Sequence, residues 1–301
     1  LTNRSQIQKS KGKYFPYNKG GEFRKWYGNA ECVLWYDIEG QKKMASMSGH
    51  RHDGRERYFQ EGISWSFVSS SNFGVRYTPT GFVFDVAGST MFLPQHDILM
   101  YVCGLLCSKL GQFFMGIQNP TMNFQVGNLR NVPLVVAKKE KIDEIVSICI
   151  EKEKEDWDSF ELSWDFKKHP LIQNIDTIEK AYECWKRECD RRFFELKENE
   201  EKINKEFIEI YNLQDELVPN IENHEVSVRR ADLKRDICSF ISYAVGCMFG
   251  RYSLDADGLI YAGGEWDNSK YVSFAVNKNN IIPIGDDEYF ENDIVSLFVE
   301  F

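Results

Sequence analysis

The sequence predicts an α+β protein. A mixed domain over residues 1–137 is followed by a mainly helical domain over residues 138–301 that contains a long amphipathic helix. Three observations predict this class. Short segments rich in aromatic and β-branched residues, separated by turn residues, lie before residue 94. Apolar residues recur at intervals of three and four between 176 and 212. The balance of charge also changes sign near Ala137.

Strands are predicted where β-branched and aromatic residues gather, at 31–37, 63–68, 73–77, 82–86 and 132–136. The linker Thr78-Pro-Thr-Gly81 has the composition of a hairpin turn, because Pro fixes φ and Gly permits a positive φ. Pro16, Gly20 and Gly21 instead predict turns rather than a continuous element.

Helices are predicted at 97–117, 139–158, 176–212 and about 228–249. The first has almost no charge, so we expect it to be buried, and Asn119-Pro120 ends it. The third would span roughly 55 Å. The tail from Gly258 onward predicts short strand-like pieces.

The eight cysteines include no Cys-x-x-Cys pair, and Cys103, Cys107 and Cys247 lie within apolar helical patterns. This favours buried free thiols in a reduced, cytoplasmic protein over disulfides or a metal site. No run approaches 18 apolar residues, so no membrane association is expected. The polar start without Met predicts a piece of a longer protein.

The charge distribution differs between the two predicted domains. The whole chain has a net charge of −9. Residues 1–137 carry 15 Lys and Arg against 9 Asp and Glu, whereas residues 138–301 carry 22 against 37. Such a split indicates nucleic-acid contact by the basic part alone, with a chance imbalance of solvated charges as the alternative.

A search for catalytic and metal-binding motifs predicts no such site. Asn119-Pro-Thr-Met122 lacks the second Pro and the aromatic residue that hold a flipped base in an aminomethyltransferase. Gly258–Gly264 is not followed by a helix with an acidic partner, so it is a weak cofactor loop. His50, His52 and Asp53 could form a metal site, but no second cluster complements them. A basic DNA-facing loop and plain solvated surface are the other interpretations of that stretch.

Basic, aromatic and Gly-rich stretches are the candidates for DNA contact. Lys and Arg neutralise phosphates, and Arg and Asn pair with base edges. A hydroxyl-rich turn suits phosphate oxygens. For any single residue, a solvated surface position is the alternative. The predicted DNA-binding residues are Lys11, Lys13, Tyr17, Asn18, Lys19, Arg24, Lys25, Trp26, Arg51, His52, Arg55, Arg57, Ser70, Ser71, Asn72 and Arg76.

Several strings together resemble the PglX-type adenine-specific methyltransferases of BREX phage-defence and large restriction-modification systems. They are Tyr14–Gly28, Glu61–Trp65, Gly81–Gly88, Asn119–Gly127, Trp157–Phe166, His169–Leu171, Arg229–Leu233 and Ile241–Tyr252. Separately, Leu105–Leu110 followed by Asn128–Leu134 is similar to the end of a target-recognition domain in type I specificity subunits.

The resemblance implies that residues 1–137 form a DNA target-recognition domain and residues 138–301 a helical spacer or interaction domain. The family's catalytic and cofactor motifs lie upstream, so this chain is expected to have no catalytic residue and no cofactor of its own. S-adenosylmethionine is implied for the intact enzyme. The implied partners are double-stranded DNA, the enzyme's own upstream methyltransferase domain and other subunits of a defence complex.

Two other functions remain open from the sequence. A protein-interaction module would present an exposed seam of Trp185, Leu196, Ile203 and Phe207, whereas burial of these residues would indicate a structural spacer. An autonomous enzyme would have to bind S-adenosylmethionine.

Overall fold

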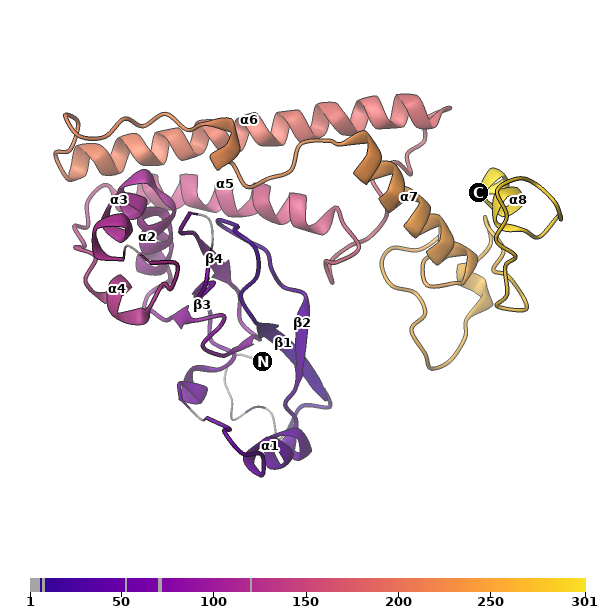
Figure 1. The fold of residues 1–301 in the computed structure, drawn as a ribbon, viewed down its shortest axis with the longest axis horizontal. Helices are drawn as coiled ribbons and strands as arrows, with labels where there is room; N and C mark the ends of the chain where they lie inside the picture. Colours follow the sequence, from indigo (N-terminus) through magenta and orange to yellow (C-terminus); the bar gives the residue numbers. More distant parts are fainter. Residues whose placement is uncertain (1–5, 7–8, 52, 70–71, 120) are drawn as a thin grey trace. The chain divides into compact units, whose positions relative to one another are not determined.

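The computed structural model describes residues 6, 9–51, 53–69, 72–119 and 121–301 (Figure 1). The predicted α+β class is confirmed, as is the long helix. The chain divides into two compact units, Leu1–Glu155 with Arg192–Val228, and Asp156–Arg191 with Arg229–Phe301. Two of the divisions fall within helices, α5 (Lys139–Asp158) and α6 (Ile178–Ile210), and the third falls in the loop before α7 (Leu233–Met248). The functional boundary near Ala137 stays a prediction.

The first unit holds two three-stranded sheets. In one, β1 (Tyr14–Asn18) pairs antiparallel with β2 (Cys32–Trp35) and parallel with β5 (Val83–Phe84). In the other, β3 (Gly62–Trp65) pairs antiparallel with both β4 (Val75–Thr78) and β6 (Thr90–Met91). Four of the predicted strand segments therefore contain strands.

The predicted hairpin across Thr78–Gly81 is wrong, because β4 and β5 belong to different sheets. The linker instead carries the chain from one sheet to the other. Phe59 holds it there, since its carbonyl accepts from Gly81 N–H at 3.0 Å and its N–H donates to the Phe82 carbonyl at 2.7 Å. The turn residues correctly predict a bend in the chain, but they do not specify which strands pair.

Strand β1 was missed because Pro16 suggested a turn. Tyr36 N–H donates to the Lys13 carbonyl, so Lys13, Phe15 and Tyr17 direct their backbone groups toward β2. Pro16 therefore turns its nitrogen to the opposite side, where β5 pairs with Tyr17 and Asn18. The missing N–H consequently costs no hydrogen bond to β2.

The predicted helix 97–117 is two helices, α2 (His96–Cys107) and α3 (Lys109–Gln118), bent by 71°. Ser108 makes the break by accepting from Gly111 N–H at 3.3 Å as the N-cap of α3. Gly111 is required at this bend, because a Cβ there would lie 2.4 Å from the Leu105 carbonyl oxygen. Within the described residues no single helix is long and apolar enough to cross a membrane, and only the bent pair α2 and α3 reaches that length and composition together.

The remaining helices of the chain were predicted in part. Helices α5 and α6 match the predicted ranges closely and α7 covers most of its range, whereas the short helices α1, α4 and α8 were not predicted. Their bounds are α1 (Ile38–Ala45), α4 (Val126–Arg130), α5 (Lys139–Asp158), α6 (Ile178–Ile210), α7 (Leu233–Met248) and α8 (Ile294–Glu300).

The main core of the first unit lies between the β3–β4 sheet, α2, α5 and the second half of α6. Fully buried side chains come from each, among them Ile63, Leu99, Val146 and Phe207. A Cβ at Gly104 of α2 would lie 2.7 Å from a Val146 methyl, so glycine permits the close approach of α2 and α5. A smaller core of Phe15, Tyr36, Phe59 and Val83 lies at the other sheet.

The seam that would have marked an interaction module is buried. Leu196, Ile203 and Phe207 are inside the first unit, and Trp185 is inside the second. These side chains therefore stabilise the fold and present no exposed docking seam.

Residues 132–136 do not form the predicted strand. Their backbone bonds to tyrosine hydroxyls instead of to a neighbouring strand. Tyr101 Oη donates to the Val135 carbonyl at 2.8 Å, while Tyr211 Oη accepts from Val135 N–H and donates to the Pro133 carbonyl. Side chains distant in sequence satisfy these groups, which no local pattern indicates.

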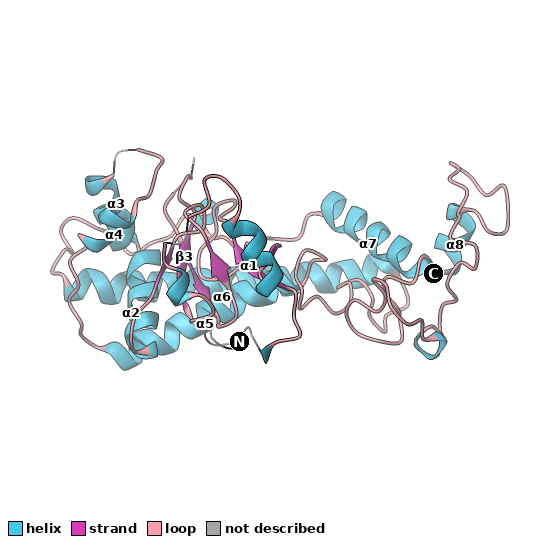
Figure 2. Ribbon diagram, turned by 90° about the horizontal axis from the view of Figure 1, so that it is seen from below, coloured by secondary structure: helices cyan, strands magenta, loops and turns pink. Residues whose placement is uncertain are grey.

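The second unit is built around α7, whose Tyr243, Ala244, Cys247 and Met248 are buried with Phe166. The chain between α7 and α8 is mostly loop (Figure 2). The described residues there form no strand, so the predicted strand-like pieces are wrong. Side chains hold these loops: Asp293 accepts from the N–H groups of Tyr289, Phe290 and Ser296.

All eight cysteines are free thiols, as predicted. Five are buried, whereas Cys32 and Cys238 are exposed and Cys184 is partly exposed. Burial raises the pKa of the Cys149 thiol well above its usual value, so this residue behaves as a small apolar side chain.

Candidate nucleic-acid interface

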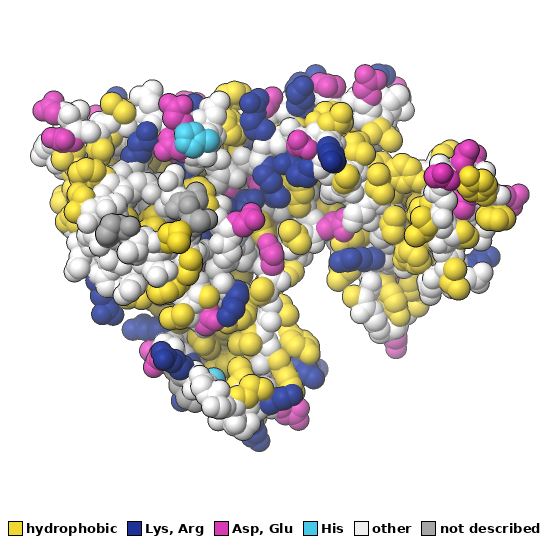
Figure 3. Space-filling model, in the orientation of Figure 1, with side chains coloured by type: hydrophobic (Ala, Val, Ile, Leu, Met, Phe, Trp, Pro, Cys, Tyr) yellow, Lys and Arg dark blue, Asp and Glu magenta, His cyan; other side chains and the backbone are white. Residues whose placement is uncertain are grey.

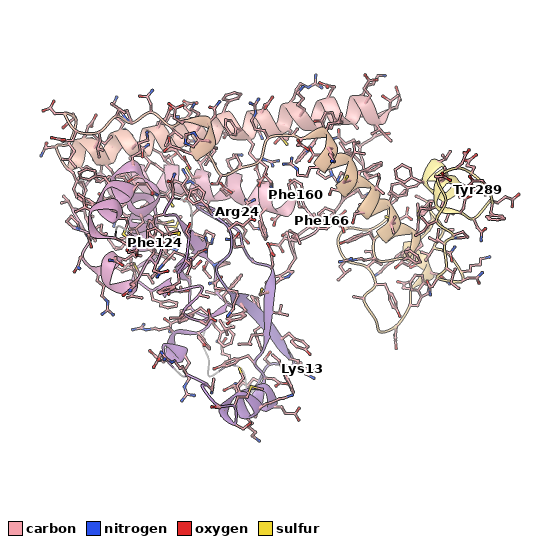
Figure 4. The ribbon with its side chains drawn as sticks, in the orientation of Figure 1. Lys13, Arg24, Phe124, Phe160, Phe166 and Tyr289 are labelled. Atoms are coloured by element: carbon pink, nitrogen blue, oxygen red, sulfur yellow. The ribbon has the colours of Figure 1, made fainter. Side chains whose placement is uncertain are left out.

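Two of the predicted DNA-binding residues, Arg24 and Lys25, lie in the interior of the first unit. Arg24 Nη1 is 2.9 Å from Glu153 Oε2 of α5, and Lys25 Nζ is 2.5 Å from Glu200 Oε2 of α6. Figure 4 shows Arg24 beside α5. Because both the guanidinium and the ammonium group face carboxylates and almost no solvent, they cannot contact DNA in this conformation.

The backbone of this segment is fixed on strand β4. Trp26 N–H donates to the Val75 carbonyl at 2.8 Å, and its own carbonyl accepts from Tyr77 N–H at 2.7 Å. Trp26 has a positive φ of 66°, and its indole Nε1 donates to Glu200 Oε1 at 2.5 Å. The segment thus joins the β3–β4 sheet to the two long helices, and Trp26 is buried rather than exposed to DNA.

The charge of Glu200 determines the ionisation of Lys25 in this interior network. Burial alone would lower the pKa of Lys25, but the charge of Glu200 and its hydrogen bond outweigh burial and raise that pKa. Ser227 donates to Glu153, so the second carboxylate also has a polar partner besides Arg24. Lys25 therefore keeps its charge inside the protein.

Arg76 is also buried but has no carboxylate among its hydrogen-bond partners in the described part of the chain. Its Nη2 donates to Ser66 Oγ at 3.4 Å. Burial, with a further contribution from neighbouring Arg24, lowers the pKa of Arg76 to about 10. Arg24, Arg76, Ser69 and Asn72 line a crevice of about 10 Å³, which is room for roughly one water molecule. Three of the predicted residues, Arg24, Asn72 and Arg76, thus meet at this small opening, together with Ser69.

Tyr17 and Lys19 form a local cluster with Asp85. Tyr17 Oη and Lys19 Nζ both donate to Asp85 Oδ2 at 2.5 Å. Burial and then the bond to Asp85 raise the pKa of Tyr17 to about 12, and the bond to Asp85 raises that of Lys19 to about 12. Asn18 is buried, where its amide donates to Thr78 Oγ1 at 3.2 Å. Lys19 is exposed, but its charge is balanced by Asp85.

The other predicted residues fall into two groups. Lys11, Lys13, Arg51, Arg57 and Asn72 are exposed and Arg55 is partly exposed. Arg55 and Arg57 lie in a 3₁₀ turn, Arg55–Arg57, which begins after Gly54 with a positive φ. His52, Ser70 and Ser71 lie outside the described residues.

A basic patch, which we define as Lys13, Trp35, Lys42 and Lys43, lies at the end of the β1–β2 hairpin and on α1. Lys13 Nζ is 4.6 Å from the Trp35 ring centre, and Lys43 Nζ is 5.3 Å from it. Lys42 and Lys43 are exposed in the last turn of α1. Figure 3 shows Lys and Arg side chains on the part of the first unit that contains α1. Figure 4 places Lys13 far from Arg24. Lys42, Lys43 and Trp35 were missed, because helix α1 was not predicted and nothing local brings them to Lys13.

Metal ligands do not gather in the described part of the chain. There, no three His, Cys, Asp or Glu side chains are grouped so that they could hold a metal ion. His50 is partly exposed and Asp53 is exposed, whereas His52, the other member of the predicted cluster, lies outside the described residues.

Comparison with known proteins shows which class of protein the chain resembles. The chain is similar over its whole length to a region of adenine-specific methyltransferases. It is 44% identical, over 316 aligned positions covering all of the chain, to the adenine-specific methyltransferase PglX of Lacticaseibacillus casei (strain Zhang). It is 34% identical, over 98% of the chain, to the adenine-specific methyltransferase BrxX of Escherichia coli O9:H4 (strain HS). No family model matches the chain.

The predicted resemblance to PglX-type methyltransferases is therefore confirmed. The chain spans 26% of the length of each of these two relatives. It thus corresponds to about a quarter of such a protein.

Proposed function

We propose that the chain is the DNA-reading segment of an adenine-specific methyltransferase, acting in restriction-modification or BREX phage defence. Residues 1–137 bind duplex DNA and position the target for a catalytic domain of the intact enzyme. That domain, and not this chain, binds S-adenosylmethionine and transfers the methyl group. The whole-length similarity to two adenine-specific methyltransferases supports this proposal.

The observation that carries the proposal is the basic patch. It brings the ammonium groups of two exposed lysines, Lys13 and Lys43, over one indole, and exposed Lys42 lies next to Lys43 in α1. Within the described residues Lys13 and Lys43 contact aromatic rings rather than carboxylates. Such lysines are available to displace the counterions of DNA phosphates. Exposed Arg51, Arg57 and Asn72 add groups that pair with base edges in a groove.

Charge reversal at the basic patch tests DNA binding. We expect the K13E/K42E/K43E variant of the 301-residue chain to bind a labelled duplex at least tenfold more weakly in fluorescence anisotropy. The matched control is K167E/K186E/K234E, which changes the same charge at exposed lysines of the second unit. Equal affinities of the two variants, with both folded by circular dichroism, would contradict the proposal.

Sequence reading is tested separately from affinity. We expect that exchanging residues 1–137 in the intact enzyme for the matching residues of a relative changes the methylated motif to that of the relative. Single-molecule methylome sequencing of a host carrying each enzyme measures this. An unchanged motif in an active hybrid would place target recognition elsewhere in the protein.

A second function, protein docking by the second unit, is favoured by its exposed apolar side chains. Ile281 is 72% exposed and Ile284 is 90% exposed, and Tyr289 and Phe290, which follow in sequence, are exposed as well. Tyr289 is labelled in Figure 4. Clustered exposure of this kind often marks an interaction surface. The expected partner is the enzyme's methyltransferase domain or another subunit of the defence complex. I281K/I284K should weaken co-sedimentation with that partner, and unchanged co-sedimentation would exclude this surface.

A further inference from the structure

The second unit contains a groove at the end of α7 whose function the DNA-reading proposal does not explain. Its volume is about 520 Å³, which falls in the range of small-molecule sites. Aromatic side chains form one part of its lining and amide side chains with one lysine form another. The lining includes Phe249, Tyr261, Trp266, Tyr271, Asn268 and Lys278.

Trp266 is held as a platform in this groove. Its ring stacks on Tyr271 with centres 4.6 Å apart and an interplanar angle of 4°, and Tyr261 meets it edge-on at 5.0 Å. Tyr271 Oη in turn donates to the Gly250 carbonyl at 2.7 Å. A Cβ at Gly250 would lie 2.5 Å from the indole, so glycine is needed for the ring to occupy this place. Despite these contacts Trp266 remains 42% exposed.

The polar groups of the groove suit a planar ring that both donates and accepts hydrogen bonds. Trp266 Nε1 donates to Asn268 Oδ1 at 2.7 Å, which orients that amide. Asn277 and Asn280 also line the groove, and exposed Lys278 supplies a positive charge beside them. An asparagine amide can pair with the edge of a purine, and an ammonium group binds phosphate.

We propose that this groove binds a free mononucleotide, with its base stacked among the aromatic side chains and its phosphate near Lys278. Bases stack on aromatic side chains whatever their sequence, since every base has a π-face. A long nucleic-acid strand is disfavoured by charge. The second unit carries 13 Lys and Arg against 21 Asp and Glu, which repels an extended polyanion.

Binding is measured by isothermal titration of AMP, GMP, CMP and UMP, and of adenosine, into the 301-residue chain. We expect saturable binding of at least one mononucleotide. Trp266→Leu should weaken it on the order of tenfold or more, as expected for loss of a stacking platform. The matched control is Trp164→Leu, which removes a tryptophan of similar exposure in the same unit that does not line the groove.

A second variant keeps the test valid if Trp266→Leu unfolds the unit. Lys278→Ala, at an exposed position, should weaken AMP binding roughly two- to fivefold and leave adenosine binding unchanged. Absence of saturable binding by the folded wild-type chain would overturn the proposal. So would binding that neither variant alters, or a single-stranded oligonucleotide that binds more tightly than its mononucleotides.

Discussion

The segment Arg24–Trp26 and the basic patch contain the same kinds of side chain in opposite environments. In the first, cations and an indole are buried against Glu153 and Glu200, and they join a sheet to two helices. In the second, lysines lie around an indole at the surface. A basic, aromatic composition therefore indicates either a folding contact or a binding surface, and the position of the carboxylates decides between them.

The largest effect is expected at the buried pair. Lys25→Met leaves the Glu200 carboxylate buried and, among the described residues, with the Trp26 indole as its one donor, so the unfolding free energy should fall by about 3–5 kcal/mol. Urea denaturation measures it. Adding Glu200→Gln should restore much of the loss, because the amide keeps an acceptor for Trp26 and carries no charge. A loss below about 1 kcal/mol for Lys25→Met would mean that the pair does not hold the fold together.

His169 contrasts with Lys25, because it is a buried basic side chain that loses its charge on folding. Its Nδ1 accepts from Leu171 N–H at 3.2 Å, and its ring lies against Phe240 and Tyr243. Burial lowers the pKa of His169 from 6.5 to about 4, although Asp236 opposes this. The unfolded chain therefore takes up the proton first, and stability falls as pH decreases from about 6.5 toward 4.

Between pH 7 and pH 5 this histidine should reduce the unfolding free energy by about 2 kcal/mol. His169→Asn keeps an acceptor for Leu171 N–H but does not titrate, so it should remove that part of the pH dependence. Denaturation curves of both proteins at the two pH values measure the difference. Equal pH dependence of the two would show that His169 ionises as freely in the folded protein as in the unfolded chain.

Lys19 should give the smallest effect on stability. Its ion pair with Asp85 is half exposed, with 52% of the lysine side chain and 34% of the carboxylate accessible. Water screens such a pair, so Lys19→Met should cost less than about 1 kcal/mol in thermal or urea unfolding. A cost as large as that of Lys25→Met would remove the distinction between buried and surface cations.

Elements with strong periodicity could be predicted from the sequence. Helix α5 matches its predicted range, and α6 needs only small corrections, because their apolar residues repeat along the chain. The break at Ser108 could not be predicted from that repeat, because a cap and a crowded Gly111 interrupt it. Residues 132–136 do not form the predicted strand, because the hydroxyl groups of Tyr101 and Tyr211, which are distant in sequence, form hydrogen bonds with their backbone.

The residue types of the candidate site could be predicted from the sequence, but the sequence did not show which of these residues are buried and which are exposed. Nothing near Arg24 or Lys25 indicates that their carboxylate partners lie 129 and 175 positions further along the chain. Likewise, Lys43 meets Trp35 and Lys13 only because α1 follows the β1–β2 hairpin. Local sequence identifies groups able to bind DNA, and long-range pairing determines which of them reach solvent.

The most direct test measures the salt dependence of duplex binding and the unfolding free energy for two variants of the 301-residue chain. One is K13M/K42M/K43M and the other is K25M/E200Q. We predict that the first flattens the slope of log K against log salt, by about 0.9 for each phosphate that the protein no longer neutralises, and leaves stability unchanged. The second should lower the unfolding free energy by less than Lys25→Met does alone, and it should keep the wild-type slope. A K13M/K42M/K43M variant with the wild-type slope would contradict the assignment of the basic patch to DNA.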